Sequence, residues 1–263
     1  MQVRPRRSVL YMPGANERAL EKAKSLPADA LILDLEDSVA PEAKETARRQ
    51  VCDCVGRGGY GGREVVIRIN ALDTPWGSAD LEAAARVPAD AILVPKVSQP
   101  SDIMGAAVMA KSAGASQSLR LWAMVETPAA VLNAREIAAV AADPASLLAC
   151  LVMGTNDLLK ESRARALDDR IAVVPWLAMT ILAGRAHGLD VIDGVYNDFK
   201  DESGFRAECE HGRTLGMDGK TLIHPSQIDP CNQIFSPTDE EVSWSMKIIK
   251  SFEQPENAKK GVI

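Results

Sequence analysis

The sequence lacks three features that would each mark a familiar class of protein: paired cysteines, a long apolar run and an excess of positive charge. Its five cysteines are an odd number, and their spacing matches no zinc-binding or redox motif. Cysteine usage of this kind is typical of a reducing cytosol, so we predict a cytoplasmic protein. No apolar run approaches the ~20 residues of a membrane span. No apolar h-region follows the N-terminal arginines, so we expect neither a membrane protein nor a signal peptide.

Acidic residues outnumber basic ones, with 36 Asp and Glu against 30 Lys and Arg and a net charge of −6. An acidic surface is a poor partner for nucleic acid and for an anionic membrane, so we expect neither as a partner. A local cluster of basic residues could still bind a small anion. The chain has 263 residues, of which 46% are hydrophobic and 25% charged. These values are typical of a globular protein with a full core, and we predict one domain over 1–263.

Short apolar runs recur along the chain, and longer stretches with helical spacing lie between them. Successive apolar residues are typical of strands that are buried on both faces, and hence of a parallel sheet. Eight strand–helix units in a chain of this length predict the α/β class and a closed (β/α)₈ TIM barrel. An open sheet is the alternative, because the last two strands are weak. The predicted strands are residues 8–12, 30–35, 64–69, 91–94, 119–125, 149–153, 189–192 and 220–223.

Helical spacing predicts helices over residues 17–25, 41–55, 129–142 and 174–187. Residues 56–62 contain five glycines in seven positions and predict a flexible connection. Residues 154–169 are polar, charged and poor in strand-forming residues, so we expect a mobile loop beside the site.

Polar residues collect just after the apolar runs. In a parallel barrel the carboxyl ends of all strands surround one mouth, where enzymes of this fold place their chemistry. Residues that are distant in the sequence should therefore meet there. The charged residues at these positions are Glu36, Asp37, Arg68, Lys96, Glu126, Asp157 and Asp193.

Carboxylates crowded around one mouth repel one another unless cations balance them. Arg68 and Lys96 balance only part of this charge, and a hard divalent cation would balance the rest. Mg²⁺ binds through one or two carboxylates, and water and substrate oxygens complete its shell. With one histidine, His224, and no cysteine at the strand ends, zinc is disfavoured.

Each of these residues also has a purely structural interpretation. Asp34 and Asp37 could bind loop amides, and Arg68 could be an ion-pair partner of Glu36. Lys96 could pair with a carboxylate, and His224 could be a packing residue. These interpretations treat each residue separately and leave the repeated placement at strand ends unexplained.

Together the strand-end motifs resemble the citrate lyase beta-subunit-like family, also called the HpcH/HpaI aldolase/citrate lyase family. The resemblance runs from Arg7 to about Lys250 and depends on the order of the motifs, since no single one is specific. They are 7–14 (RSVLYMPG), 32–39 (ILDLEDSV), 66–70 (VIRIN), 94–96 (VPK), 125–128 (VETP), 154–158 (GTNDL) and 219–228 (GKTLIHPSQI).

The resemblance implies a TIM barrel that forms a homotrimer, uses Mg²⁺, and cleaves or forms carbon–carbon bonds in hydroxy-acid thioesters. The thioesters are citryl, malyl or citramalyl derivatives of coenzyme A or acyl carrier protein, and the products include a keto acid. Glu126 and Asp157 match the metal ligands, and Arg68 matches the arginine that contacts the keto acid. Glu36 and Asp37 match acidic residues near the metal-bound waters.

The resemblance also suggests positions for the rest of the substrate. Arg18 and Lys22, in the first predicted helix, fall where family members meet coenzyme A phosphates. Apart from the resemblance, the expected mechanism places Lys96, Glu126 and the backbone amides of Gly154, Thr155 and Asn156 in contact with the acid portion. We therefore expect Arg68, Glu36 and Asp37 to be catalytic, with the last two positioning water or relaying a proton.

Four other activities are open at this stage. The chain could be a metal-dependent aldolase of 4-hydroxy-2-oxo acids, a Schiff-base aldolase using Lys96, or a thioesterase acting on the same thioesters. It could also be a non-catalytic metabolite-binding homologue. Family members usually continue into a tail whose aspartate reaches a neighbouring subunit, whereas this sequence ends at Ile263, about where that tail should begin.

Overall fold

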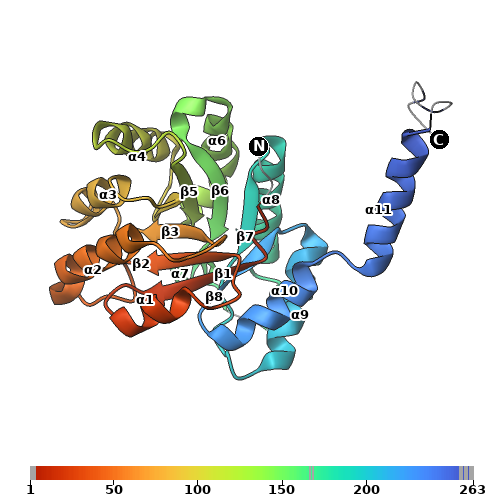
Figure 1. The fold of residues 1–263 in the computed structure, drawn as a ribbon, viewed down its shortest axis with the longest axis horizontal. Helices are drawn as coiled ribbons and strands as arrows, with labels where there is room; N and C mark the ends of the chain where they lie inside the picture. Colours follow the sequence, from red (N-terminus) through yellow and green to blue (C-terminus); the bar gives the residue numbers. More distant parts are fainter. Residues whose placement is uncertain (1–3, 166, 168, 255–256, 258–259, 261–263) are drawn as a thin grey trace.

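The computed structural model describes residues 4–165, 167, 169–254, 257 and 260. Eight parallel strands form one closed barrel in sequential order, and the helices surround it (Figure 1). The predicted (β/α)₈ barrel is therefore confirmed. The strands are β1 (Ser8–Pro13), β2 (Ala30–Asp34), β3 (Glu64–Arg68), β4 (Ala91–Val94), β5 (Arg120–Val125), β6 (Leu148–Met153), β7 (Asp190–Asp193) and β8 (Gly219–Leu222).

All eight predicted strands are present, including the two weak ones. The barrel closes because β1 pairs with β8 through Ser8 and Lys220, among others. The junction of β7 and β8 is short, with Ile192 opposite Gly219 and Asp193 opposite Lys220.

The interior of the barrel is filled by apolar side chains such as Val9, Val66 and Trp122. At the amino ends of the strands, the guanidinium of Arg6 lies 5.0 Å from the centroid of the Trp122 ring and pairs with Glu64 at 2.7 Å. Arg6, Glu64 and Trp122 thus occupy the amino end of the barrel.

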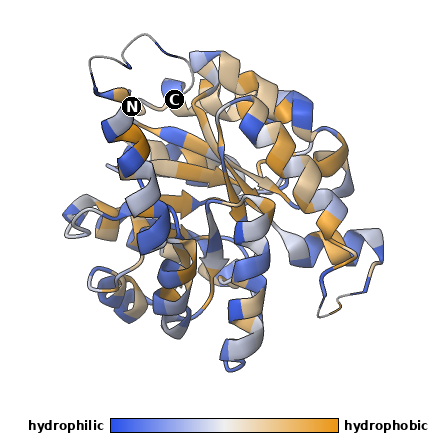
Figure 2. Cartoon of the chain, turned by 90° about the vertical axis from the view of Figure 1, so that its right-hand side faces the viewer, coloured by the Kyte–Doolittle hydropathy of each residue, from blue (hydrophilic) through white to orange (hydrophobic). Residues whose placement is uncertain are grey.

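The helices lie outside the barrel, and apolar residues gather on the strands and on the helix faces that cover them (Figure 2). No helix of the described residues combines the length and the apolar character that a bilayer span requires. The helices are α1 (Glu17–Ala23), α2 (Lys44–Arg57), α3 (Gly77–Ala85), α4 (Pro100–Ser112), α5 (Pro128–Leu132), α6 (Ala134–Ala139), α7 (Thr155–Ser162), α8 (Val174–Ala186), α9 (Glu202–Leu215), α10 (Ile228–Phe235) and α11 (Asp239–Phe252).

The predicted loop over residues 154–169 is wrong in its first half, because α7 begins directly after β6. The helix buries Leu158 against the barrel, and its polar residues form the solvated face. Residues 166 and 168 of the predicted loop lie outside the described part. In the glycine-rich stretch, Gly56 belongs to α2, and Gly58, with φ of +67°, follows its last residue.

Candidate active site

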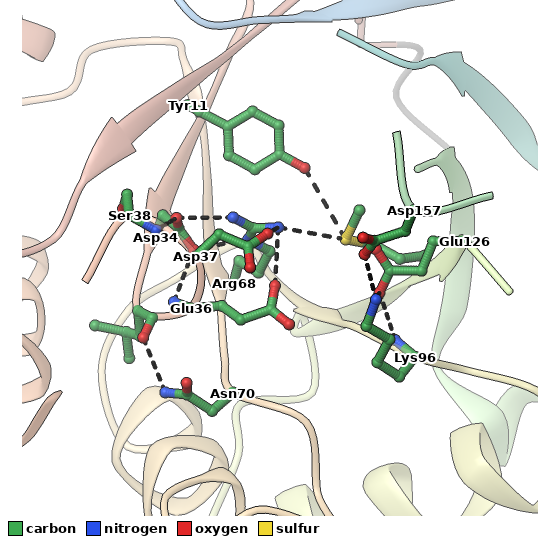
Figure 3. A network of polar contacts seen from close by, with 12 residues as sticks. Tyr11, Asp34, Glu36, Asp37, Ser38, Arg68, Asn70, Lys96, Glu126 and Asp157 are labelled. Atoms are coloured by element: carbon green, nitrogen blue, oxygen red, sulfur yellow. Dashed lines mark hydrogen bonds and ion pairs between the residues drawn. The ribbon is translucent and has the colours of Figure 1, made fainter. Parts of the chain in front are cut away.

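Two carboxylates at the carboxyl ends of the strands converge on one ammonium group. Glu126 follows β5 and is 2% exposed, whereas Asp157 lies in the first turn of α7. The backbone N–H of Lys96 donates to Glu126 Oε1 at 2.7 Å, and Lys96 Nζ lies 3.7 Å from the same oxygen. Nζ also donates to Asp157 Oδ2 (Figure 3). The structure thus brings Glu126 and Asp157 together at one mouth, and their role as metal ligands stays a prediction.

Two backbone features bring these groups together. Lys96 has φ of +54°, in the left-handed region that residues other than glycine seldom adopt. Lys96 adopts this conformation two residues after the end of β4, and its backbone N–H there donates to Glu126. A Cβ at Gly154 would lie 2.3 Å from Glu126 Cβ, so the close approach of β5 and α7 requires glycine there.

Arg68, at the end of β3, is the centre of a second cluster. Its Nε and one terminal nitrogen donate to the two oxygens of Asp34, at 2.7 and 2.8 Å. Its other terminal nitrogen lies 2.8 Å from Glu36 and 3.1 Å from Asp37. The guanidinium lies 4.8 Å from the centroid of the Tyr11 ring. Arg68 is therefore held rigidly, and Asp34 is its strongest partner (Figure 3).

Asp34 has a larger role than the sequence indicated. It accepts hydrogen bonds from the backbone amides of Glu36, at 2.8 Å, and Ser38, at 3.0 Å, as the structural interpretation expected. It also fixes Arg68, which the sequence analysis missed. The available signal was the strand register, since Asp34 and Arg68 are direct neighbours on β2 and β3.

Burial shifts the acidities of the site. It raises the pKa of Glu126 to about 7. It also raises the pKa of Glu36 to about 8, and the negative charges of Glu126 and Asp37 add to this effect. Burial would lower the pKa of Lys96, but its hydrogen bond to Asp157 and the charge of Glu126 outweigh this and raise it. Lys96 therefore stays charged, while Glu36 retains a proton near neutral pH.

A cavity of about 330 Å³ lies between the two clusters. The predicted site residues that line it are Asp37, Arg68, Glu126, Gly154, Thr155, Asn156 and Asp157. Lys96 and Glu36 contact lining residues without lining the cavity themselves. Arg18 and Lys22 are exposed on α1 and are not among the residues that line it.

Asp193 ends β7 as predicted but does not reach this cavity. Its carboxylate is fully buried and accepts from Arg170 at 2.6 and 3.0 Å and from Lys220 at 3.1 Å. Lys220 also donates to Glu208 at 2.5 Å. We call these four residues the β7–β8 quartet. The sequence gives little warning of it, because Arg170 and Glu208 are distant in the chain and follow no motif.

His224 behaves as the packing residue that the structural interpretation expected. Its ring stacks on Phe199 with centroids 4.5 Å apart, and its Nδ1 lies 2.8 Å from Ser226 Oγ.

The residues present fit a magnesium ion. Within the described residues no group of three or more His, Cys, Asp or Glu side chains is placed to hold a metal, so the protein offers two carboxylates at most. Two carboxylate ligands leave coordination positions for water and substrate, as Mg²⁺ prefers. The ammonium of Lys96 lies between Glu126 and Asp157, so a positive charge is already accommodated at the position proposed for the metal ion.

Comparisons with known proteins show which family this chain resembles. The model of the family described as HpcH/HpaI aldolase/citrate lyase matches residues 7–225. A (3S)-malyl-CoA thioesterase from Cereibacter sphaeroides is 50% identical over 261 residues, which cover 99% of this chain and 88% of that protein. The citrate lyase subunit beta of Escherichia coli is 34% identical over 267 residues, covering 100% and 87%.

A solved structure extends the comparison to ligands. The protein CitE from Mycobacterium tuberculosis, in complex with magnesium, acetoacetate and coenzyme A, superimposes with a TM-score of 0.76 at 27% identity. The match covers 94% of this chain and 86% of that one.

Proposed function

The chain belongs to the HpcH/HpaI aldolase/citrate lyase family, and on this premise we propose that it is a Mg²⁺-dependent enzyme acting on a hydroxy-acid thioester of coenzyme A. The first candidate substrate is (3S)-malyl-CoA. The observation that carries the proposal is the convergence of Glu126 and Asp157 on one cation at the edge of a cavity that Arg68 also lines.

Glu126 and Asp157 would hold the metal. When bound, Mg²⁺ supplies charge that polarises substrate oxygens and neutralises negative charge as it develops. Its binding would also compensate the buried carboxylate of Glu126, whose pKa burial raises. Lys96 would then turn from the carboxylate pair toward the acid portion of the substrate.

The remaining residues of the mouth would orient the substrate. The first amides of α7, at Thr155 and Asn156, lack helical acceptors and face an anion favourably. The expected contact from the Gly154 amide is wrong, because its N–H donates to Val125 O at 3.0 Å. The guanidinium of Arg68 is fixed by Asp34 and can stabilise an oxygen on which negative charge develops. Glu36 and Asp37, next to Arg68, are placed to position water or relay a proton.

Hydrolysis is the reaction that the 50% identity to (3S)-malyl-CoA thioesterases favours. Water attacks the thioester carbonyl, the carbon–sulfur bond breaks, and the thiolate leaves and takes up a proton. The products are malate and free coenzyme A. In this reaction Asp37 would take the proton from the attacking water, because Glu36 retains its own proton near neutral pH.

Carbon–carbon cleavage is the second candidate, favoured by the family and by the 34% identity to a citrate lyase subunit. A base removes the proton of the substrate hydroxyl, and the bond between the hydroxyl-bearing carbon and the thioester side breaks. The electron pair passes to a thioester enolate, which is then protonated. Malyl-CoA would give glyoxylate and acetyl-CoA.

The remaining alternatives receive less support. A Schiff base at Lys96 needs a neutral amine, whereas the ion pair with Asp157 keeps this amine charged. An aldolase of free 4-hydroxy-2-oxo acids would share the metal site but would not need coenzyme A. A metabolite-binding homologue would bind Mg²⁺ without turnover.

The decisive experiment measures products from malyl, citramalyl and citryl thioesters of coenzyme A in the presence of Mg²⁺. We expect free thiol and malate from (3S)-malyl-CoA, whereas acetyl-CoA with glyoxylate would identify the lyase instead. No product from any thioester, together with cleavage of 4-hydroxy-2-oxo acids, would overturn the proposal.

In the same assay, replacing Arg18 and Lys22 by alanine should raise KM and leave kcat unchanged if these residues meet the phosphates of coenzyme A.

The metal site has its own test. Glu126→Gln and Asp157→Asn should each weaken Mg²⁺ binding at least tenfold in calorimetric titration, because each removes one of two charged ligands. They should also lower kcat/KM by about 10³-fold. Glu136→Gln, an exposed change on α6, is the control. Unchanged Mg²⁺ affinity in both site variants would contradict the assignment.

A further inference from the structure

Lys44, the first residue of α2, has a buried ammonium group with an unusual set of partners. Its side chain is 6% exposed, and Nζ donates to the backbone oxygens of Leu35 at 3.0 Å and Glu36 at 2.8 Å. Nζ lies 5.5 Å from the centroid of the Trp76 ring. Among the described residues, Lys44 has no ion pair within 4.0 Å. Burying a cation without a carboxylate partner is costly, so this arrangement calls for a reason.

The two carbonyls belong to the turn that carries Glu36 and Asp37 to the mouth. Asn70, two residues after the end of β3, holds the same turn, since its Nδ2 donates to Leu35 O at 2.9 Å (Figure 3). Asn70 is in turn held by Asp80, which is fully buried and accepts from its side chain at 2.5 Å and its backbone N–H at 3.0 Å. The turn is therefore fixed from behind by two side chains that do not line the cavity.

The charge of Lys44 also acts on the acidic cluster. Burial lowers the pKa of Lys44, and the negative charges of Asp34 and Glu36 oppose this effect. A cation placed behind the turn lowers the free energy of every anionic state in front of it. The charged or titratable groups that face Glu36 are Tyr11 on β1, Asp34 and Asp37 on its own segment, Arg68 at the end of β3, Lys96 after β4 and Glu126 after β5.

We propose that Lys44 is a positioning residue of the active site: it holds the main chain of Leu35 and Glu36 and supplies the positive charge behind the Glu36 and Asp37 carboxylates. The inference rests on the proposed function only in assigning Glu36 and Asp37 to the reaction. The contacts of Lys44 and its effect on Glu36 are independent of the substrate.

Two variants separate the two contributions. Lys44→Met removes both the charge and the donors, whereas Lys44→Gln removes the charge but keeps a donor for the carbonyls. The control is Lys24→Met, because Lys24 also lies 5.5 Å from an aromatic ring centroid, that of Tyr60, and bonds to Glu21 at 3.0 Å away from the mouth. Each protein is measured as the full chain, with its unfolding temperature recorded.

The readouts are the pH profile of kcat/KM and the titration of Glu36 by ¹³C NMR, with the Glu36 signal assigned from its loss in Glu36→Gln. Without the charge of Lys44 the pKa of Glu36 should rise, so the NMR midpoint and the limb of the profile move to higher pH by on the order of one unit in both variants. At the pH optimum, the kcat/KM of Lys44→Met should be about tenfold lower than that of Lys44→Gln.

An unchanged Glu36 midpoint in both variants would overturn the inference, because a purely structural lysine would alter stability alone. If Lys44→Met does not fold, Lys44→Gln carries the test. If no thioester is turned over, the proposed function fails while the NMR titration still decides the role of Lys44.

Discussion

At the scale of single residues, the charges of the mouth are satisfied unequally. Asp34 receives two directed hydrogen bonds from Arg68, and this ion pair helps to lower its pKa against the opposing effect of burial. Glu36 shares the remaining nitrogen of Arg68 with Asp37, and its buried Oε2 has no hydrogen bond of good geometry. Asp34 is thus a fixed support for Arg68, whereas Glu36 remains available for proton transfer.

Glu36 should make the stability of the metal-free protein depend on pH. Its folded pKa, about 8, lies above the ordinary value of 4.5, so between these pH values the native state keeps a proton that the unfolded chain releases. The stability present below pH 4.5 is therefore lost as the pH rises toward 8. In EDTA, we expect the free energy of unfolding to fall over this window by on the order of 3 kcal/mol.

Urea unfolding at successive pH values checks this expectation. Glu36→Gln should remove about half of the decrease, because Glu126, with a pKa of about 7, contributes the rest, while Glu45→Gln, an exposed change on α2, should keep all of it. A decrease of the same size in Glu36→Gln would mean that another group is responsible.

The sequence predicted the members of the site better than their partners. Barrel topology brings every strand end to one mouth, so Arg68, Lys96, Glu126 and Asp157 could be placed together without knowing any side-chain conformation. The choice of Asp34 over its neighbours as the main partner of Arg68 depends on register and side-chain direction, which a list of strand ends does not contain.

At the scale of elements, β7 and β8 show how a weak strand pair is stabilised. Their apolar runs are short, which is why the sequence predicted them with least support, and in the structure their shared register is brief. The β7–β8 quartet compensates, because Lys220 donates across the junction to Asp193 at 3.1 Å and to Gly194 O at 2.5 Å. The polarity of the segment 154–169 misled the loop prediction, because α7 forms there with only Thr155 and Leu158 buried.

Removing Lys220 should destabilise the barrel at this junction. Lys220→Met leaves Asp193 and Glu208 without one of their two buried cations, so we expect a loss of about 3 kcal/mol in the free energy of unfolding. Lys247→Met, an exposed change on α11, should stay within about 0.5 kcal/mol. Hydrogen exchange at the amides of β8 should accelerate in the first variant only. A loss below about 1 kcal/mol would show that the quartet contributes little.

At the scale of the whole molecule, the two ends of the barrel differ in how their charged groups are paired. Arg6 and Trp122 fill the amino end with an ion pair and a ring stack, and the carboxyl end carries the raised pKa values of Glu36 and Glu126. Crowded carboxylates are tolerated there because the strand ends are fixed by the closed sheet.

The whole chain also presents an apolar helix that its own barrel does not cover. In Figure 1, α11 stands away from the barrel, and the structure buries none of its residues. Its exposed apolar side chains are Val242, Trp244, Met246, Ile248, Ile249 and Phe252. Six exposed apolar side chains on one helix are typical of a protein contact.

We expect this surface to support the homotrimer that the family resemblance implies. Light scattering coupled to size-exclusion chromatography should give three times the mass of one chain. Replacing Met246 and Ile249, three positions apart on α11, by glutamate should shift the protein toward the monomer, because each change places a charge where apolar contact is required. Ser243→Glu adds the same charge at a polar position and should leave the trimer intact. A monomeric wild-type protein, or a trimer that survives both glutamates, would show that α11 does not hold the assembly together.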